Sequence, residues 1–325
     1  MNLNKKNLKK IEGDASFRIF YREKNRKNKK SSILVYTTKD KEKNLLIYDS
    51  INKLLIKKKI LAPKLYSENY NNNYITIQDF GNKTLFKILK NKKINNIKLF
   101  KKILILLSNI QKIKQNRIKN FKGKYYKVPI YSKKKLLEET ELFLKWYVPD
   151  VLPKKKVSNV NKNLKKKIFY LLSKIKLPNK TFVHRDFHIS NIMKFKNKLA
   201  LIDSQDAVYG NRAYDLASLI DDVRFQTSNR FKNQIYKYYL NINKGKINKK
   251  SFKNDFEILS VLRNLKIIGI FTRLSKRDNK KKYLKLIPYA WKLIEFRINN
   301  NPYFDDLKNC LKTNFSYKIR RKNEN

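Results

Sequence analysis

Two short apolar segments, each followed directly by polar residues, constrain the fold of this chain more than any other feature. The segments Thr181–Val183 and Leu199–Ile202 interrupt a long stretch of helical periodicity, and their length and composition are typical of buried β-strands. The first leads into residues 184–191, which contain both histidines of the protein, and the second ends at Asp203. The pattern predicts that functional side chains follow each strand directly.

The residues after the first segment have the spacing of a kinase catalytic loop. His184, Arg185 and Asp186 form an H-R-D triplet, and Asn191 follows five residues after the aspartate. We expect Asp186 to accept the proton of an acceptor hydroxyl, and Asn191 and Asp203 to hold Mg²⁺ through hard oxygen atoms. Phosphoryl transfer needs mainly positioning and neutralisation of negative charge, which this set can provide. Arg185 is included with Asp186 in the predicted catalytic set.

We expect different roles for the two histidines. His184 is interpreted as a buried residue that braces the loop rather than reacting. His188 lies two residues after Asp186, where it could donate a hydrogen bond to the γ-phosphate, so it joins the predicted catalytic set. A packing role for His188 is the alternative.

The N-terminal quarter of the chain is predicted to be rich in β-strands with one helix. Strand patterns cover Phe17–Tyr21, Ile33–Tyr36 and Tyr74–Gln78, and helical spacing covers Asp40–Lys58, which Pro63 terminates.

From Thr84 onward, apolar residues recur with helical period over long spans. These spans are Ile94–Ile113, Lys133–Tyr147, Leu164–Ile175, Ala213–Tyr239, Phe252–Leu274 and Tyr283–Ile298. The sequence therefore predicts an α+β protein with a nucleotide-covering N-terminal lobe at residues 1–80. Residues 81–325 are predicted to form a helical C-terminal lobe with the catalytic loop and the acceptor pocket, and the chain end from residue 317 is interpreted as a frayed tail.

The formal net charge of +54 first suggests a nucleic-acid or anionic membrane partner. The excess, however, is mostly lysine spread over almost every segment. A nucleic-acid site more often gathers Arg and Lys on one face with interleaved aromatic residues. We therefore interpret the charge as a general property of the surface, and no nucleic-acid partner is expected.

The lone cysteine and the start of the chain indicate the compartment. Cys310 cannot form an intramolecular disulfide, and it lies far from both histidines, which excludes a metal cluster of these residue types. The basic residues at the start are not followed by an apolar stretch, and no later segment approaches a membrane-spanning run. The sequence therefore predicts a cytoplasmic protein without membrane insertion.

Residues Asp79, Phe80 and Gly81 spell the D-F-G triplet of kinases, but they precede the catalytic loop, so the chain order is wrong for a metal loop. The triplet follows a predicted strand at the lobe boundary, where we expect a linker whose backbone contacts adenine. A P-loop is excluded because the sequence has no G-x-x-x-x-G-K-[ST] motif.

Seven motifs are spread over most of the chain: GDASFR (13–18), QDFG (78–81), LFLKWY (142–147), VHRDFHISN (183–191), IDSQDAVYG (202–210), YDLASL (214–219) and RNLKIIGIFTRLSKRD (263–278). Together they resemble the aminoglycoside phosphotransferase and choline kinase superfamily. Within it, they are most similar to bacterial kinases of the anomeric hydroxyl of N-acetylmuramate and N-acetylglucosamine. The resemblance implies a bilobal protein-kinase-like fold, with ATP and Mg²⁺ as cofactors.

The resemblance also implies which residues bind the ligands. GDASFR is similar to a turn that covers the nucleotide phosphates with backbone amides. The residues expected to bind ATP are Gly13, Asp14, Ser16, Phe17, Arg18, Gln78, Asp79 and Phe80. The residues expected to contact the acceptor are Trp146, Gln205, Asp206, Arg273 and Arg277. Packing in a helix core is the alternative for the tryptophan, and bracing of the last helices is the alternative for the two arginines.

Two features depart from protein kinases. The strand ILVY ends in Tyr36, where a lysine for the α- and β-phosphates is expected, and only Lys39 and Glu42 are near enough to act as substitutes. Only a short segment separates Asp203 from Tyr214, which leaves no room for an activation loop and disfavours protein-kinase activity.

The function predicted first is an ATP-dependent amino-sugar 1-kinase of cell-wall recycling, with a small-molecule sugar as substrate. Kinases of another small alcohol, such as an aminoglycoside, choline or homoserine, are the alternatives. A cationic aminoglycoside needs an acidic pocket. The chain has 25 acidic residues against 79 basic ones, which disfavours an aminoglycoside as the substrate. A basic nucleic-acid-associated pseudokinase is the alternative from another class, and the intact set of Asp186, Asn191 and Asp203 disfavours it.

Overall fold

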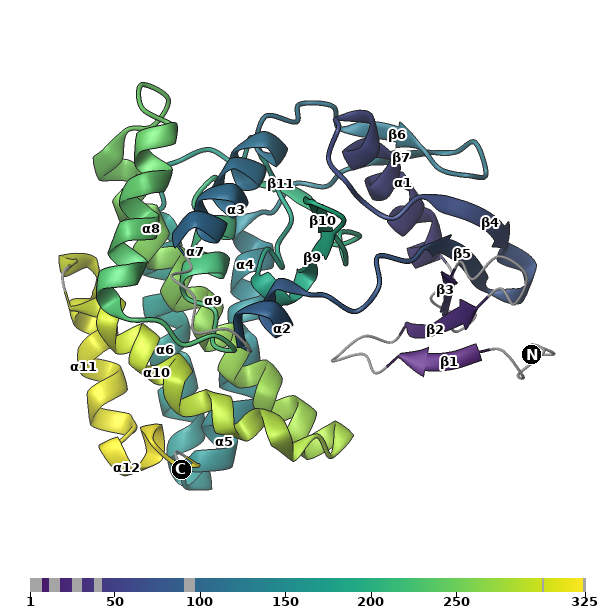
Figure 1. Ribbon diagram of the computed structural model, residues 1–325. Coiled ribbons are helices and arrows are strands. Elements are labelled where there is room, and N and C mark those ends of the chain that lie inside the picture. The colour runs from purple at the N-terminus through teal and green to yellow at the C-terminus, as the bar shows by residue number, and fades with distance from the viewer. Residues whose placement is uncertain are drawn as a thin grey trace. The chain divides into compact units, whose positions relative to one another are not determined.

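A five-stranded antiparallel sheet begins the part of the chain that the computed structural model describes, namely residues 8–11, 18–24, 31–37, 43–90, 97–299 and 301–323 (Figure 1). The strand order is β1-β2-β3-β5-β4. The strands are β1 Leu8–Ile11, β2 Ile19–Lys24, β3 Ser31–Tyr36, β4 Leu65–Asn69 and β5 Tyr74–Gln78. The apolar β3 holds the central position, where its middle residues are buried.

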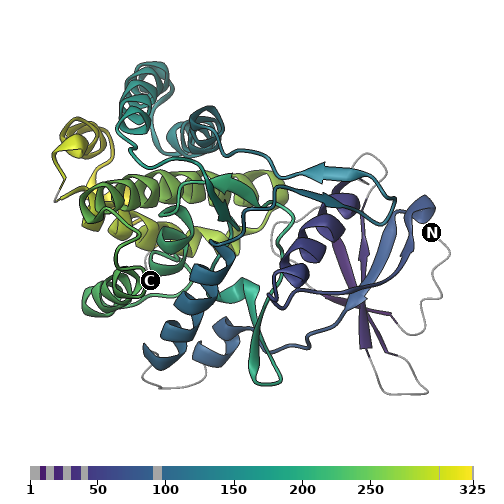
Figure 2. The ribbon, with the colours of Figure 1, turned by 90° about the horizontal axis from the view of Figure 1, so that it is seen from above.

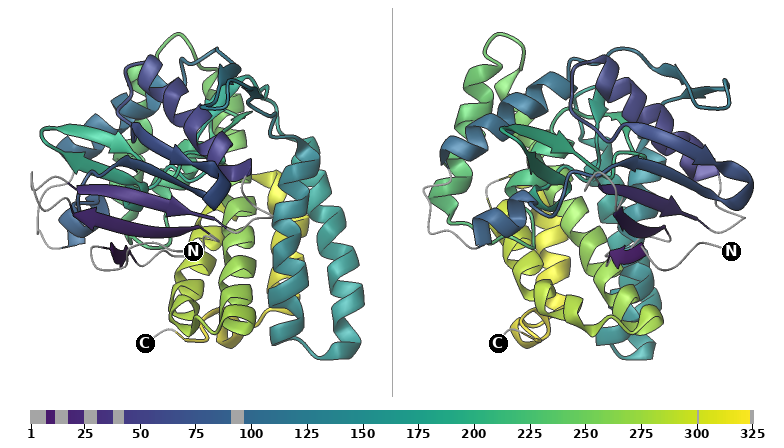
Figure 3. Two further views of the ribbon diagram at one scale, coloured as in Figure 1. Left: turned by 90° about the vertical axis from the view of Figure 1, so that its right-hand side faces the viewer. Right: turned by 45° about the vertical axis from the view of Figure 1, so that its right-hand side comes forward.

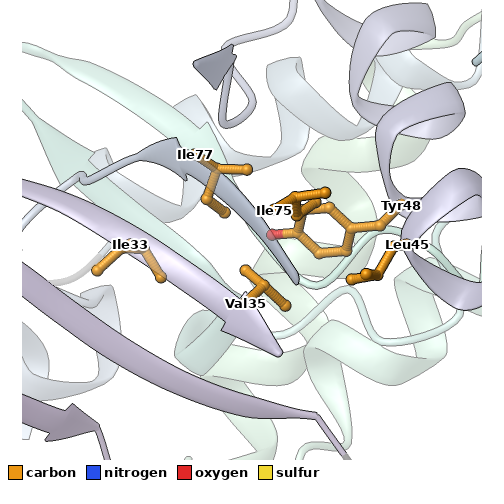
Figure 4. Packing of buried hydrophobic residues seen from close by; sticks show 6 residues of the cluster. All are labelled: Ile33, Val35, Leu45, Tyr48, Ile75 and Ile77. Carbon is orange, nitrogen blue, oxygen red and sulfur yellow. The ribbon is translucent and has the colours of Figure 1, made fainter. Parts of the chain in front are cut away.

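Helix α1, Lys43–Lys57, covers one face of this sheet (Figure 2). Alternate residues of β3 and β5 point to that face because side chains alternate along a strand. Leu45 and Tyr48 lie three residues apart on α1 and meet them. The resulting core, shown in Figure 4, consists of Ile33, Val35, Leu45, Tyr48, Ile75 and Ile77.

The chain divides into two compact units, residues 1–129 with 184–208 and residues 130–183 with 209–325. The first unit contains the sheet, α1 and the antiparallel hairpin of β9, Ile192–Phe195, and β10, Lys198–Leu201. Its other elements are α2 Leu85–Lys90, α3 Ile97–Ile110, β6 Arg117–Lys119 and β7 Tyr125–Lys127. The boundary expected between residues 80 and 81 stays a prediction.

The β9–β10 hairpin is built into the first unit by backbone and side-chain contacts. The amide of Leu201 donates to the Leu61 carbonyl at 2.8 Å, and that of Lys194 donates to the Lys83 carbonyl at 2.9 Å. The hairpin also shares a small apolar cluster with the linker after β5, made of Phe80, Met193 and Ala200 with Leu61, Phe195 and Ile202 at its edge.

Helices make up most of the second unit, where α4 and α6 lie beside α9 (Figure 3). They are α4 Lys133–Leu142, α5 Val148–Val151, α6 Lys154–Ser173, α7 Tyr214–Ile220, α8 Asn229–Ile242, α9 Lys249–Asp278, α10 Ile287–Ile298, α11 Asp305–Asn314 and α12 Tyr317–Arg320. The short strands β8, Thr181–Val183, and β11, Val208–Gly210, mark two of the three points where the chain passes between the units. Within the described ranges, no helix combines the length and apolarity needed to cross a bilayer.

The predicted order of a β-rich N-terminal part followed by helices is confirmed, but the helical period noted at Ala213–Tyr239 does not continue as one helix. Two helices, α7 and α8, replace it, separated by residues 221–228. The side chain of Asp221, directly after α7, is bound by Arg297 of α10, and Ser228 caps the start of α8. Tertiary ion pairing and a new N-cap thus override the helical period.

The frayed tail expected at the end of the chain is also wrong. It contains α12, and Arg320 and Arg321 form ion pairs with Glu295 of α10. The sequence does not predict β1 and β4, because LKKI and LYSEN contain few apolar residues and expose their polar ones.

Candidate active site

Residues 184–191 form a tight loop between β8 and β9. The backbone amide of His188 donates to the Asp186 carbonyl at 3.0 Å, and that of Asn191 donates to the His188 carbonyl at 2.9 Å. The side-chain amide nitrogen of Asn191 also donates to the Asp186 carbonyl, at 3.1 Å. These bonds hold Asp186 and Asn191 together and engage the amide nitrogen of Asn191, so its amide oxygen is the atom that could bind a cation.

Two residues of this region have a left-handed backbone, Arg185 with φ 72° and Asp203 with φ 62°. Such strain in residues with side chains persists only where the surroundings fix it, and it is common at active sites. The Arg185 guanidinium donates to the Asp206 carbonyl at 3.3 Å, and the Ile202 amide donates to the Asn191 carbonyl at 3.1 Å. The loop of residues 184–191 and the segment that follows β10 are therefore connected at two points.

Both histidines of the loop are buried. His184 is fully buried and bonds to the backbone of Ile202, and desolvation lowers the pKa of its ring against the opposing effect of nearby carboxylates. A neutral ring that joins the loop to β10 fits the predicted bracing role. His188 is 6% exposed, and its Nε2 lies 3.4 Å from the amide nitrogen of Asn191. Its contact with a γ-phosphate stays a prediction.

Asp203, at the end of β10, lies between a cation and a second carboxylate. Arg18 donates from Nη2 to Asp203 Oδ1 at 2.6 Å. Burial raises the pKa of Asp203, Arg18 opposes this rise, and repulsion from Asp186 adds to it. A bound cation would relieve this repulsion between the two carboxylates.

The side-chain oxygen atoms of Asn191 and Asp203 fit Mg²⁺ that is bound together with a nucleotide. No group of three or more His, Cys, Asp or Glu side chains in the described ranges could hold a metal ion alone. Asn191 and Asp203 supply one amide and one carboxylate oxygen, and Mg²⁺ usually takes one or two carboxylates plus water and substrate phosphates. The pair is therefore suited to a metal that arrives with phosphate oxygens.

The linker after β5 has its acidic side chain engaged on several sides. Arg22 of β2 binds both oxygens of Asp79, at 2.6 and 2.9 Å, and the Gly81 amide donates to the same carboxylate at 2.7 Å. Burial alone would raise the pKa of Asp79, but these hydrogen bonds outweigh it and lower the pKa. The carboxylate thus fixes the linker, and ATP contacts of Gln78, Asp79 and Phe80 stay predictions, with the backbone as the expected contact.

Most of the GDASFR motif cannot be placed, because it lies outside the described residues. The residues concerned are Gly13, Asp14, Ser16 and Phe17, and the expected lysine substitutes Lys39 and Glu42 lie outside them as well. Arg18 is described, and it contacts the candidate metal ligand directly.

The residues expected to contact the acceptor fall into the two units. Gln205 and Asp206 follow the candidate metal ligand Asp203 in the first unit, where the Gln205 amide donates to Asp206 Oδ2 at 2.6 Å. Trp146, Arg273 and Arg277 belong to the second unit; the first two are half-buried, and Arg277 pairs with the neighbouring aspartate at the exposed end of α9. Their contacts with an acceptor stay predictions.

The segment that carries Trp146 is held by a close helix contact that the sequence analysis did not single out. Residues Phe143–Tyr147 form a π-helical turn, a conformation that often marks functional sites. A Cβ atom at Gly269 of α9 would lie 2.3 Å from the carbonyl carbon of Leu142. Only glycine permits this approach, and the signal for it was a glycine inside a helical pattern.

Two residues of α1 contact the site without having been expected there. Asn52 accepts a hydrogen bond of 2.7 Å from Ser204, and its side chain bonds to the Tyr48 hydroxyl. The ring of Tyr48 lies 5.5 Å from the Arg18 guanidinium. Because Ser204 follows Asp203 directly, α1 is connected to the candidate metal ligand. The only sequence signal for these two residues was their i,i+4 spacing, which places them on one face of α1. This spacing is also found in ordinary helix cores, so it does not indicate a site.

A buried aspartate of α9 fixes the chain just before β8. Asp255 is fully buried and accepts hydrogen bonds from the backbone amides of Lys176 and Leu177, at 2.9 and 2.7 Å. The side chains of Asn211 and Asn254 donate to the same carboxylate at 2.7 and 3.0 Å. The buried carboxylate thus accepts four hydrogen bonds, two of which anchor the segment that leads into β8.

Known proteins resemble this chain in sequence. A model of the phosphotransferase enzyme family matches residues 130–248. An N-acetylmuramate/N-acetylglucosamine kinase of Pseudomonas putida is 26% identical over 301 residues, which cover 90% of this chain and 84% of the relative. The kinase of the same name from Pseudomonas aeruginosa is 24% identical over 92% of this chain and 86% of its own length. The kinase of the same name from Neisseria meningitidis serogroup B is 31% identical to this chain over 166 residues, which are half of each chain.

Solved structures share the fold at low sequence identity. A gentamicin complex of an aminoglycoside phosphotransferase has a TM-score of 0.63 at 14% identity, over 90% of this chain and 93% of that one. The choline kinase of Streptococcus pneumoniae has a TM-score of 0.60 at 14% identity, over 89% and 93% of the two chains. Sequence and structure therefore confirm the predicted resemblance to the aminoglycoside phosphotransferase and choline kinase superfamily, whose kinase-like fold this chain has.

Proposed function

We propose that this protein transfers the γ-phosphoryl group of ATP to the anomeric hydroxyl of N-acetylmuramate or N-acetylglucosamine. The observation that carries the proposal is the loop on which Asp186 and Asn191 are held together, next to Asp203 with its cationic partner. The Pseudomonas relatives, which cover most of the chain and carry the names of these two sugars, support the acceptor. The net charge of +54 also suits a sugar that carries a carboxylate.

Four residues of the candidate site have distinct roles in this proposal. Asp186 orients the acceptor hydroxyl and accepts its proton as the bond to phosphorus forms. Asn191 and Asp203 hold Mg²⁺, which, when bound with ATP, neutralises charge on the phosphates. His184 keeps the loop against β10, so that the carboxylate and the metal ligands stay in one arrangement. The proposal places the enzyme in the cytoplasm.

A phosphate-transfer assay with purified protein and radiolabelled ATP tests the proposal. The acceptors are N-acetylmuramate, N-acetylglucosamine, kanamycin, choline and homoserine, and Asp186→Asn controls for contaminating kinases. We expect Mg²⁺-dependent turnover with one or both amino sugars, and none by the variant. Turnover with kanamycin, choline or homoserine alone would assign another acceptor.

The same preparation tests the nucleic-acid alternative. A diffuse lysine surface should bind DNA only weakly, and this binding should vanish near physiological salt because exposed charges are screened. Submicromolar DNA affinity at that salt, together with no turnover on any small alcohol, would replace the kinase by a nucleic-acid-binding pseudokinase.

A further inference from the structure

The elements β3 and α1 lack the ion pair with which protein kinases hold the α- and β-phosphates. In those kinases, a lysine of the third strand pairs with a glutamate of the following helix. β3 has the sequence SSILVY, and Asp49 is the single acidic residue of α1. Its carboxylate binds Lys53 at 2.8 Å and the backbone of Phe121. Neither partner of the kinase pair is therefore present in these two elements.

Arg18 brings a cation to the site from a different position, just before β2. Its guanidinium donates to Asp203 at 2.6 Å, and its side chain is 4% exposed against 38% for the carboxylate. The rings of Phe20 and Tyr48 lie 5.7 and 5.5 Å from the guanidinium carbon. Two aromatic rings and a charge-assisted hydrogen bond thus fix a cation at a carboxylate that solvent and ligands can reach.

Helix α1 supports this cation through neutral groups. Tyr48 and Asn52 lie on one face of the helix, and Asn52 joins the Tyr48 hydroxyl to Ser204. Burial raises the pKa of Tyr48 to about 12 against the opposing effect of Arg18, so the phenol is neutral at physiological pH. The contact between α1 and the metal segment therefore needs no glutamate.

We infer that Arg18 replaces the kinase strand lysine and exchanges between two partners. In the nucleotide-free protein it neutralises Asp203, and when Mg²⁺ takes that carboxylate, the guanidinium passes to the phosphate oxygens that arrive with the metal. The exchange is favourable because Mg²⁺ in nucleotide sites is held by one or two carboxylates together with substrate phosphates, and because the planar fork of arginine matches phosphate. The inference rests on the proposed function only in taking a Mg²⁺-bound nucleotide as the ligand.

Exchange makes two affinities move in opposite directions, which a merely structural role would not do. Arg18→Gln removes the competitor for Asp203, so Mn²⁺ alone, measured by electron paramagnetic resonance, should bind about threefold tighter or more. The same variant should bind the fluorescent nucleotide mant-ATP with Mg²⁺ about tenfold more weakly or worse. Arg18→Lys keeps the charge and should stay within about fivefold of the wild type for the nucleotide.

Lys24→Gln is the matched control, because this exposed cation is on the strand that follows Arg18. It should change neither affinity. Circular dichroism tests whether each variant is folded. If Arg18→Gln does not fold, the nucleotide affinity of Arg18→Lys is the remaining test. Unchanged nucleotide affinity of Arg18→Gln, weakening of both affinities, or loss of nucleotide binding in a folded Arg18→Lys would refute the exchange.

The outcome separates this inference from the proposed acceptor. A wild-type protein that binds Mg²⁺-mant-ATP and phosphorylates no amino sugar would refute the acceptor, while opposite shifts in Arg18→Gln would still support the exchange. Amino-sugar turnover by the wild type, with nucleotide affinity unchanged in Arg18→Gln, would refute the exchange alone.

Discussion

Asp221→Asn tests the buried ion cluster that connects three helices of the second unit. Asp221 is fully buried, and Arg297 of α10 binds both of its oxygens at 2.8 and 3.1 Å. Ser260 of α9 donates to it at 2.6 Å, and the ammonium of Lys232, itself 2% exposed, lies 3.4 Å away. The asparagine would keep the shape of the side chain and remove its charge.

The size of the effect follows from the pKa of this carboxyl. Burial alone would raise it, but Arg297 and Lys232 lower the pKa of Asp221 from 3.8 to about 2, which corresponds to about 2–3 kcal/mol of folding free energy. The variant also leaves two buried cations without their anion, so we expect a total loss of about 3–5 kcal/mol at pH 7. Because folding lowers this pKa, the stabilisation is present above pH 3.8 and is lost as the pH falls through about 2.

Urea unfolding followed by tryptophan fluorescence measures this loss selectively, because both tryptophans, Trp146 and Trp291, belong to the second unit. The difference between Asp221→Asn and wild type should narrow as the pH is lowered from about 4 toward 2. Glu138→Gln is the control, since its ion pair with Lys135 is exposed and should contribute less than about 1 kcal/mol. A loss below about 1 kcal/mol at pH 7, or one independent of pH, would refute the reasoning.

Three further variants test other parts of the molecule. Gly269→Ala places a methyl group 2.3 Å from the Leu142 carbonyl carbon, so it should lower the free energy of unfolding by about 3 kcal/mol in the same urea assay; a loss below about 1 kcal/mol would contradict the close contact. Asp186→Asn should abolish turnover with little change in mant-ATP affinity, because the amide cannot accept the hydroxyl proton; a near wild-type rate would remove Asp186 from the mechanism. Asp203→Ala should abolish the Mg²⁺-dependent part of nucleotide binding in calorimetry, and an unchanged affinity would show that the metal site is misplaced.

The sequence predicted the parts of the site that are local in the chain. Asp186 and Asn191 are five residues apart, and an apolar strand precedes each of the two polar segments, so spacing and period were enough to place the two residues on one loop. The pair of Arg18 with Asp203 joins residues 185 positions apart, and no local pattern encodes such a contact. The bond between Asn52 and Ser204 is equally non-local.

The errors in the fold have the same physical origin. Helical period continues through residues 213–239, but the ion pairs of Asp221 are tertiary and stop α7 where the local pattern does not. β1 and β4 are strands because β2 and β5 pair with them through backbone hydrogen bonds, which do not depend on side-chain polarity.

The division of the first unit into residues 1–129 and 184–208 has a consequence for biosynthesis. The sheet and α1 leave the ribosome first, whereas the β9–β10 hairpin that packs on Leu61 and Phe80 is completed about 120 residues after Phe80, at Leu201. At about 5–20 residues per second, the delay is about 6–24 s, and residues 130–183 of the second unit are synthesised within it. A nascent chain that stalls before β9 therefore leaves this apolar linker uncovered and open to chaperones, and only a chain extended past β10 can bury it.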